Sequence, residues 1–263
     1  MIVDSHCHLD QLDLAEYHGE LDQALAAAKA QGVEYFLCVC IDMENFPRVL
    51  AIAKEYPQIS ASVGLHPNST NVYEPSVDEL IELAELPEVV AVGETGLDYY
   101  RSEGDLDWQQ QRLRRHIRAA CEVGKPLIIH SRNARDETIK ILKEEKAQEV
   151  GGVLHCFTET LEMAKQAIDL GFYISFSGIL TFKNAIALQE VAKALPLERI
   201  LIETDCPYLA PMPFRGKPNQ PAYVRYVAEC LSELRGLPIE EVARVTTDNF
   251  FNCFSLCQRG EGV

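Results

Sequence analysis

Eight short apolar runs recur along the chain, and a segment with helical spacing follows each of them. The runs lie at residues 2–3, 33–41, 59–63, 89–92, 127–129, 152–154, 172–176 and 199–202. Strands that alternate with helices form a parallel sheet, because each helix returns the chain to the edge at which the next strand begins. Eight such units close into a barrel. We therefore predict an α/β fold, specifically a TIM (β/α)8 barrel.

Apolar residues at helical spacing predict nine helices. They cover about residues 15–31, 46–56, 76–86, 105–123, 134–146, 161–170, 183–195, 222–234 and 239–251. Ser76 and Glu79 form a capping-box pattern at the start of the third helix. The long polar helix 105–123 is expected to keep its arginines in solvent, namely Arg112, Arg114, Arg115 and Arg118.

The length of 263 residues fits one barrel domain, which we expect to span residues 1–263. No apolar run is long enough to cross a membrane, and no basic segment followed by an apolar run opens the chain. We therefore expect a cytoplasmic protein with no membrane partner and no obligate protein partner. The nine scattered cysteines form no Cys-x-x-Cys pair, so we expect packed, reduced thiols.

The formal net charge of -16 argues against a broad basic surface for duplex nucleic acid. It does not argue against an enzyme that takes a strand end into a pocket. Bound divalent cations would reverse the sign of the charge at such a pocket.

His6 and His8 stand one residue apart at the end of the first strand-like segment. Side chains along a strand alternate between its faces, so both imidazoles point one way and Cys7 points the other way. Histidine is the commonest metal ligand and binds through a neutral ring nitrogen. Two ligands do not fill a coordination shell, so ordinary polar contacts are an equal alternative for this pair taken alone.

Other residues of ligand type follow the later strand-like runs. They are His66, Glu94, His130, His155 and Asp205, while His18 and His116 fall in predicted helices. The carboxyl ends of the strands form the face of a TIM barrel where active sites lie. Independent polar caps on the strands are the alternative, but the number of such residues favours a common site.

Four imidazoles and two carboxylates are too many for one tetrahedral catalytic zinc ion with an open position. They suit two divalent ions about 3.5–4 Å apart, bridged by a carboxylate. We predict one ion held by His6, His8 and Asp205, a second held by His130 and His155, and Glu94 as the bridge. Mixed imidazole and carboxylate ligation tolerates Zn, Mn, Fe or Mg.

Two metal ions with a bridging water indicate a hydrolase, because the ions lower the pKa of the water and polarise the scissile group. Asp205 and Glu94 are therefore the predicted catalytic residues, with Asp205 accepting a proton from the water. Asp98 and Glu203 are candidates for carboxylates that orient the metal ligands. A surface or capping role is the alternative for both.

Several residues near the strand ends are candidates for substrate contacts. Arg132 can clamp an anionic oxygen, with an ordinary loop ion pair as the alternative. Tyr99 and Tyr100 can stack on a base or sugar, with simple packing as the alternative. Arg215 and Lys217, in the loop after the last strand, can attract phosphate or can be solvated charges.

Six segments in order carry a wider resemblance. They are residues 3–10 (VDSHCHLD), 64–67 (GLHP), 93–99 (GETGLDY), 126–132 (PLIIHSR), 154–157 (LHCF) and 201–209 (LIETDCPYL). Together they resemble the TatD family of metal-dependent hydrolases, most of all its YcfH-like branch. Cys206 stands where serine is frequent in the family, and we expect little effect because it should point away from Asp205.

The resemblance implies a TIM-barrel metallohydrolase of the amidohydrolase superfamily. It carries metal-ligand roles onto the same six residues that the strand ends indicate, and it implies that His66 lies at the substrate phosphate. Members of the family are described as divalent-metal-dependent deoxyribonucleases, some of them 3′ exonucleases. The resemblance thus implies DNA as the substrate, bound locally at the site.

The sequence is compatible with three functions. The first is a deoxyribonuclease that cleaves phosphodiester bonds with two metal ions. The second is a metal-dependent hydrolase of a small ester, lactone or amide, which the negative net charge favours mildly because DNA is repelled at long range. The third, a non-catalytic metal-binding or docking protein, has no chemical need for a complete ligand set.

Overall fold

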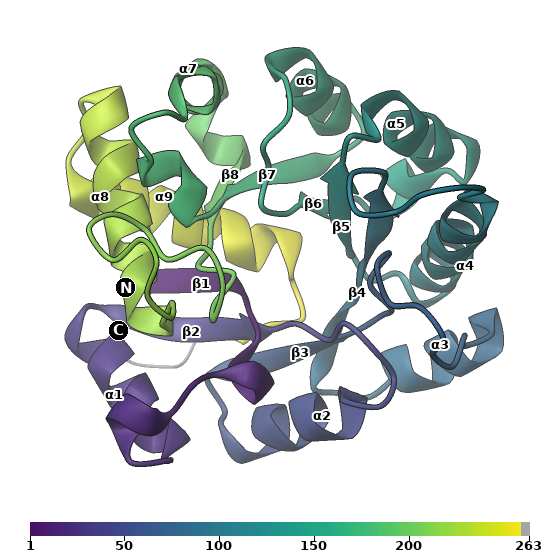
Figure 1. Ribbon diagram of the computed structural model, residues 1–263, viewed down its shortest axis with the longest axis horizontal. Helices are drawn as coiled ribbons and strands as arrows, with labels where there is room; N and C mark the ends of the chain where they lie inside the picture. Colours follow the sequence, from purple (N-terminus) through teal and green to yellow (C-terminus); the bar gives the residue numbers. More distant parts are fainter. Residues whose placement is uncertain (259–263) are drawn as a thin grey trace.

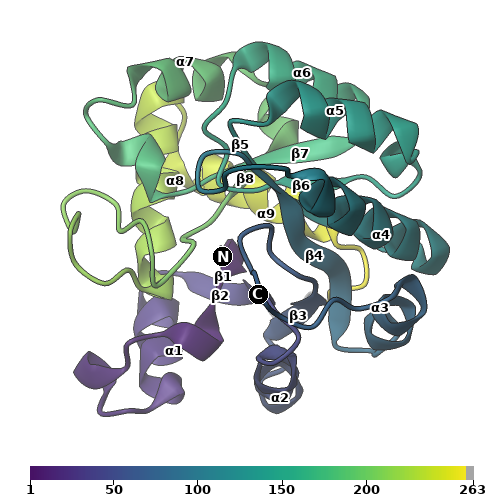
Figure 2. The ribbon, with the colours of Figure 1, turned by 45° about the vertical axis from the view of Figure 1, so that its right-hand side comes forward.

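Eight parallel strands, each paired with the next in chain order, form the sheet of the computed structural model, which describes residues 1–258 (Figure 1). The strands are β1 (Ile2–Cys7), β2 (Val33–Cys38), β3 (Ile59–Val63), β4 (Val89–Asp98), β5 (Leu127–Arg132), β6 (Gly152–Leu154), β7 (Phe172–Phe176) and β8 (Ile200–Ile202). Helices surround the strands in both views (Figures 1 and 2). The predicted TIM barrel is confirmed.

Hydrogen bonds between β1, β8 and the residues after them bring the two ends of the sheet together. The Asp205 backbone N–H donates to the His6 carbonyl at 2.9 Å, and the His8 N–H donates to the Cys206 carbonyl at 2.9 Å. The Ser5 hydroxyl donates to a β8 carbonyl at 3.0 Å. The contact places the residues after β8 directly beside the end of β1.

The helices lie close to their predicted positions. They are α1 (Leu21–Ala30), α2 (Phe46–Glu55), α3 (Val77–Ala84), α4 (Asp107–Val123), α5 (Arg135–Glu144), α6 (Leu161–Asp169), α7 (Ile186–Ala194), α8 (Val224–Arg235) and α9 (Ile239–Cys253). The Ser76–Glu79 capping box forms as predicted. None of the helices within residues 1–258 combines the length and apolarity that a membrane crossing needs.

The prediction of one helix over residues 15–31 was wrong. The segment begins with a short 3-10 turn at Ala15–Tyr17, and α1 starts only at Leu21. His18 and Gly19 separate the two with φ angles of 56° and 85°, which are incompatible with a continuous α-helix. His18 therefore lies in a turn rather than in a helix.

Strand β4 runs beyond the apolar run that predicted it and ends only at Asp98. Its continuation contains Gly93 and Gly96, with φ angles of 145° and 147°. A Cβ atom on Gly96 would collide with the backbone carbonyl of His130 on β5. These glycines therefore let β4 and β5 stay paired up to the residues of the predicted site.

Apolar side chains fill the barrel from two directions. One cluster lies between strands and helices, and a second lies inside the barrel around Val3, Leu37 and Ile128. Phe250 and Phe254 of the α9 region join the inner cluster and are fully buried. In Figure 1, α9 lies behind the strands, where it closes the end of the barrel at which they begin. The opposite end is left for the polar residues.

Arg112 is an exception to the solvated arginine face predicted for α4. It is 1% exposed, and its guanidinium donates to the backbone carbonyls of His66 at 2.6 Å and Ser69 at 2.9 Å. It also pairs with the Glu74 carboxylate. The loop after β3 supplies enough acceptors to bury a charge, which helical periodicity could not reveal. Arg112 thus ties that loop to α4.

His116 supports the same loop from one turn further along α4. It is fully buried, its Nδ1 donates to the Arg112 carbonyl at 2.8 Å, and its Nε2 accepts from the Leu65 N–H at 3.1 Å. Both bonds require a neutral imidazole. Burial lowers the pKa of His116 to about 4.

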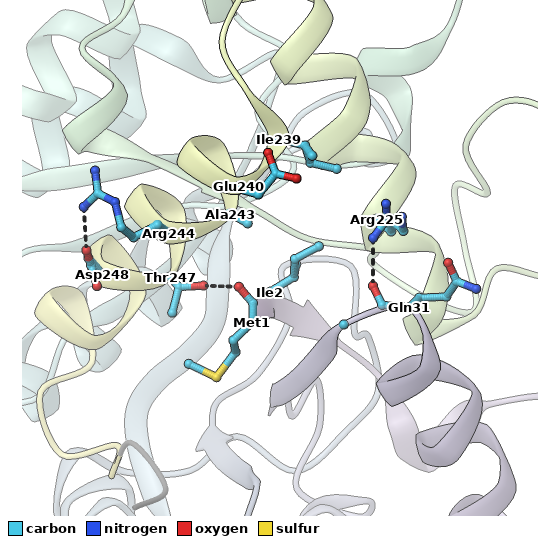
Figure 3. Close-up of a pocket in the computed structure, with 11 residues that line it drawn as sticks. Met1, Ile2, Gln31, Arg225, Ile239, Glu240, Ala243, Arg244, Thr247 and Asp248 are labelled. Atoms are coloured by element: carbon cyan, nitrogen blue, oxygen red, sulfur yellow. Dashed lines mark hydrogen bonds and ion pairs between the residues drawn. The ribbon is translucent and has the colours of Figure 1, made fainter. Parts of the chain in front are cut away.

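A cavity of about 610 Å³ opens at the amino-terminal end of the barrel, where Met1 precedes β1 (Figure 3). Arg225 and Arg244 line it, but both have partners within the chain. Arg225 donates to the Gln31 carbonyl at 3.4 Å, and Arg244 pairs with Asp248 at 3.2 Å. This cavity lies at the other end of β1 from His6.

We predict that His116→Gln weakens the dependence of stability on pH. The unfolded imidazole, with a pKa near 6.5, binds more protons between pH 6.5 and 4 than the folded one, so wild-type stability falls as pH falls through this window. The loss specific to His116 approaches about 3 kcal/mol at the low end. Urea unfolding of both proteins at several pH values measures it, and parallel curves would contradict the assignment.

Candidate metal centre

Glu94 lies at the centre of the polar residues that the strands bring together. Its carboxylate is buried, and five imidazoles surround it. Oε2 lies 3.3 Å from His6 Nε2 and 3.9 Å from His8 Nε2. Oε1 lies 2.7 Å from His155 Nε2, 3.2 Å from His130 Nδ1 and 3.2 Å from His66 Nε2. The two oxygens thus face two different sets of histidines.

Asp205 completes the set on the side of Glu94 Oε2. Its Oδ1 lies 3.4 Å from His8 Nε2 and 3.6 Å from His6 Nε2. The two histidine nitrogens are themselves 3.4 Å apart. His6 and His8 therefore do share a face, while Cys7 points away and donates to a β2 carbonyl. A shift in the β1–β2 register between Asp4 and Cys7 accompanies this arrangement.

In three imidazole rings, the nitrogen that points away from Glu94 donates a hydrogen bond. In a neutral ring, this bond leaves a lone pair on the nitrogen that faces Glu94. His8 Nδ1 donates to the Val39 carbonyl at 2.9 Å. His155 Nδ1 donates to Glu203 Oε1 at 3.3 Å. His130 Nε2 donates to Asp98 Oδ2 at 3.2 Å. The remaining nitrogen of each ring therefore points inward without a proton in the neutral form, as metal ligation requires.

His66 has the opposite arrangement. Its Nδ1 accepts a hydrogen bond from the backbone N–H of Asn68 at 3.0 Å. A neutral ring then carries its proton on Nε2, the atom that faces Glu94. By distance, His66 belongs to a group with Glu94 and His130 that could hold an ion. By hydrogen bonding it presents a donor to the site rather than a lone pair.

The buried carboxylates of the cluster are stabilised by positive charge. Burial alone would raise the pKa of Glu94, but the charges of His155 and His66 hold it well below its usual range. Burial alone would lower the pKa of His8, but its hydrogen bond with Asp205 raises it to about 9. The pKa of His155 lies well above its usual range because Glu94 and Glu203 outweigh burial. Without another cation, protons balance the buried carboxylates.

The residues fit divalent metal ions. The inward lone pair of His155 Nε2 faces a carboxylate oxygen at 2.7 Å, and the atom is buried without a hydrogen bond in the part of the chain that the structure describes. Two lone pairs at that separation require a cation between them, either a proton or a metal ion. Imidazole nitrogen and carboxylate oxygen are the usual donors for Zn, Mn or Fe.

The two carboxylates predicted to orient metal ligands, those of Asp98 and Glu203, contact His130 and His155 on the side away from Glu94. Glu203 is fully buried and also accepts from the Cys156 N–H at 2.8 Å. Asp98 is 1% exposed and accepts from the side chain of Asn68 at 2.8 Å. The structure therefore places both beside rings that face the cluster.

Sequence analysis missed Asp4, two residues before His6. It accepts hydrogen bonds from the Thr204 N–H at 2.8 Å and the Thr204 hydroxyl at 2.5 Å. Burial raises its pKa to about 8. Asp4 thus joins the end of β1 to the residue before Asp205. Its only sequence signal is a carboxylate inside an otherwise apolar strand start.

Apart from His66, the candidates for substrate contacts make no contact with this cluster among the residues that the structure describes. Arg132 ends β5 and lies 4.0 Å above the Tyr100 ring, which is exposed. Tyr99 is half-buried, and its hydroxyl accepts from Gln110 of α4 at 3.1 Å. Arg215 lies 4.3 Å from the Phe182 ring centre. Lys217, in the same loop as Arg215, is exposed.

We predict that Asp98→Asn and Glu203→Gln each weaken metal binding about 10- to 100-fold. The neutral amide no longer holds the ring of His130 or His155 in its orientation as the carboxylate does. Titration calorimetry with Mn²⁺ measures the affinity. Asp136→Asn, which removes the same charge from an exposed position on α5, is the matched control. Equal affinities for all three variants would show that these carboxylates do not orient ligands.

The chain is similar to known proteins along nearly its whole length. A family model described as TatD related DNase matches residues 3–255. The uncharacterized metal-dependent hydrolase YcfH of Escherichia coli (strain K12) is 48% identical over 256 residues, covering 97% of this chain and 96% of that protein. The uncharacterized metal-dependent hydrolase YabD of Bacillus subtilis (strain 168) is 42% identical over 257 residues, covering 97% and 100%.

A solved structure agrees with these sequence matches. The crystal structure of YjjV, a TatD homolog from Escherichia coli K12, superposes with a TM-score of 0.89 at 32% identity, covering 97% of this chain and 98% of that one. The family match, the sequence identities and the fold agree with the resemblance found in the sequence. The chain belongs to the TatD family of metal-dependent hydrolases.

Proposed function

We propose that this hydrolase is a deoxyribonuclease that cleaves phosphodiester bonds of DNA with two divalent ions. In the proposal, His6, His8 and Asp205 hold one ion, His130 and His155 hold the other, and Glu94 contacts both. Such ions supply Lewis acidity to the scissile phosphate and lower the pKa of the attacking water. The division of histidines between the two Glu94 oxygens supports this partition.

The observation that carries the choice of substrate is the hydrogen bond that His66 Nδ1 accepts from the Asn68 N–H at 3.0 Å, which leaves the proton of a neutral His66 ring on Nε2. Its Nε2–H faces the cluster, and its side chain is 17% exposed, so it is accessible from the mouth of the site. A donor at this point suits an anionic oxygen of a phosphodiester, whose negative charge persists through the reaction. Arg132 near the mouth adds a cationic donor for a phosphate.

Asp205 is the proposed proton acceptor. Its Oδ1 faces His6 and His8, while its Oδ2 makes no hydrogen bond to any residue within 1–258. Its side chain is 14% exposed, against 3% for Glu94, so it is the carboxylate nearer to solvent. Burial alone would raise the pKa of Asp205, but the hydrogen bond with His8 lowers it. The ionised carboxylate can take the proton of the attacking water.

Hydrolysis of a small ester, lactone or amide is the second candidate. The net charge of -16 favours it, because a polyanion is repelled until it reaches the site. The same metal-binding residues can serve either reaction, since a fold and its metal centre support many substrates. Cleavage of DNA therefore has to be measured directly.

We predict that Glu94→Gln abolishes metal-dependent shortening of end-labelled single-stranded DNA while the protein stays folded. The amide keeps the shape of the side chain but loses the charge that the two sets of histidines share. Assays with Mg²⁺ or Mn²⁺ measure the activity, and circular dichroism measures folding. Glu82→Gln, an exposed position on α3, is the matched control.

His66→Gln separates substrate binding from metal binding in the same assay. Loss of one donor to the phosphate is expected to cost about 10²–10³ in kcat, with the metal content unchanged. Full activity of Glu94→Gln would remove the bridging role. Activity of the wild-type protein on small esters or amides only, with none on DNA, would favour the second candidate.

A further inference from the structure

Arg132 has no carboxylate partner among the residues that the structure describes. Seven others each pair with a carboxylate: Arg112, Arg114, Arg115, Arg118, Arg135, Arg225 and Arg244. The Arg132 guanidinium makes no ion pair or hydrogen bond with any residue that the structure describes and lies 4.0 Å over the Tyr100 ring. Its donors are therefore available to an anion from outside the chain.

The position of Arg132 relates it to the metal centre. Side chains two residues apart share a face of a strand, so Arg132 and His130 leave β5 in the same direction. His130 Nδ1 faces Glu94, at the centre of the cluster. Arg132 therefore lies one strand repeat further out, toward the mouth of the barrel.

Asp98 fixes Tyr100 to the same framework. Its Oδ1 accepts from the backbone N–H groups of Tyr100 at 3.0 Å and Arg101 at 2.9 Å. Its Oδ2 binds His130 at 3.2 Å. One buried carboxylate thus holds a histidine of the centre and the backbone that carries the tyrosine. The pair Tyr100–Arg132 is set at a defined place relative to the centre.

Tyr100 presents an open aromatic surface at this place. Its side chain is 62% exposed, and Arg132 covers one side of the ring. Tyr99 is directed toward α4 instead, so the stacking contact considered for either tyrosine moves to Tyr100. A flat apolar surface beside an unpaired guanidinium matches the two parts of a nucleotide, its base and its phosphate.

We infer that Tyr100 and Arg132 form a subsite for the nucleotide next to the scissile phosphate in a single-stranded DNA end, with the base on Tyr100 and its phosphate on Arg132. The inference rests on the proposed function and adds the two residues that bind the nucleotide. A base can stack on a protein side chain only when it is released from its neighbours, which selects single strands over duplex. One local cation also suits a chain that is otherwise strongly acidic.

The test compares two substrates of the metal-loaded protein. One is a single-stranded thymidine decamer, and the other is bis(4-nitrophenyl) phosphate, a small diester with no second phosphate for Arg132. For Tyr100→Ala and Arg132→Gln, the ratio of kcat/KM for the decamer over that for the small diester is expected to fall about tenfold. Tyr73→Ala, at a tyrosine 57% exposed and held by Glu79, should leave the ratio unchanged.

Salt dependence separates the two roles. Removing a phosphate contact lowers the slope of log affinity against log salt concentration by about 0.7 for single strands. For the decamer, the slope should decrease by this amount in Arg132→Gln and stay unchanged in Tyr100→Ala. An unchanged substrate ratio, or equal losses on both substrates, would overturn the subsite, because the side chains would then act elsewhere or on the centre itself.

Failure of the proposed function gives a different result. If the wild-type protein cleaves neither diester, the nuclease proposal fails, and fluorescence anisotropy of the labelled decamer on the metal-loaded protein then tests the subsite alone. Weaker binding by Tyr100→Ala and Arg132→Gln than by Tyr73→Ala supports the subsite. Equal binding by all three variants overturns it.

Discussion

The candidate metal centre depends on one buried carboxylate, that of Glu94. Transfer of an isolated carboxylate from water into a protein interior is costly, and the group normally takes up a proton instead. Here the pKa moves the other way, because His155 and His66 lie close to it. The ionised form persists only while cations surround it, whether these are imidazolium groups or metal ions. The ionised carboxylate of Glu94 and the cations around it therefore stabilise one another.

The backbone of the barrel positions Glu94 and the histidines around it. Gly93 and Gly96 let β4 approach β5 closely enough to place Glu94 beside His130. The contact between the ends of β8 and β1 brings Asp205 to His6. Acceptors behind His8, His130 and His155 then fix the tautomers of these rings, whereas His66 accepts a hydrogen bond at Nδ1. The partner of the remote nitrogen thus decides whether a neutral ring presents a lone pair or an N–H group to the site.

Much of the fold and of the residue cluster around Glu94 could be predicted from the sequence, because both depend on the order of the strands and on the residue types at the strand ends. Strand ends converge in a barrel, so residues far apart in sequence, such as His6 and Asp205, could be placed together. Features that depend on packing between elements could not be predicted. Arg112 was predicted on the solvated face of α4. It is buried because the loop after β3 folds over it. Tyr100 rather than Tyr99 is exposed, because the backbone beyond β4 is turned by Asp98.

We propose that Glu94 contacts two metal ions and that His66 binds neither. A crystal structure of the protein grown with Mn²⁺, with anomalous scattering to locate the ions, would show where they lie. We expect two anomalous peaks, one against each oxygen of Glu94, with His66 outside both coordination shells. A single ion, or an ion coordinated by His66 Nε2, would refute the proposal.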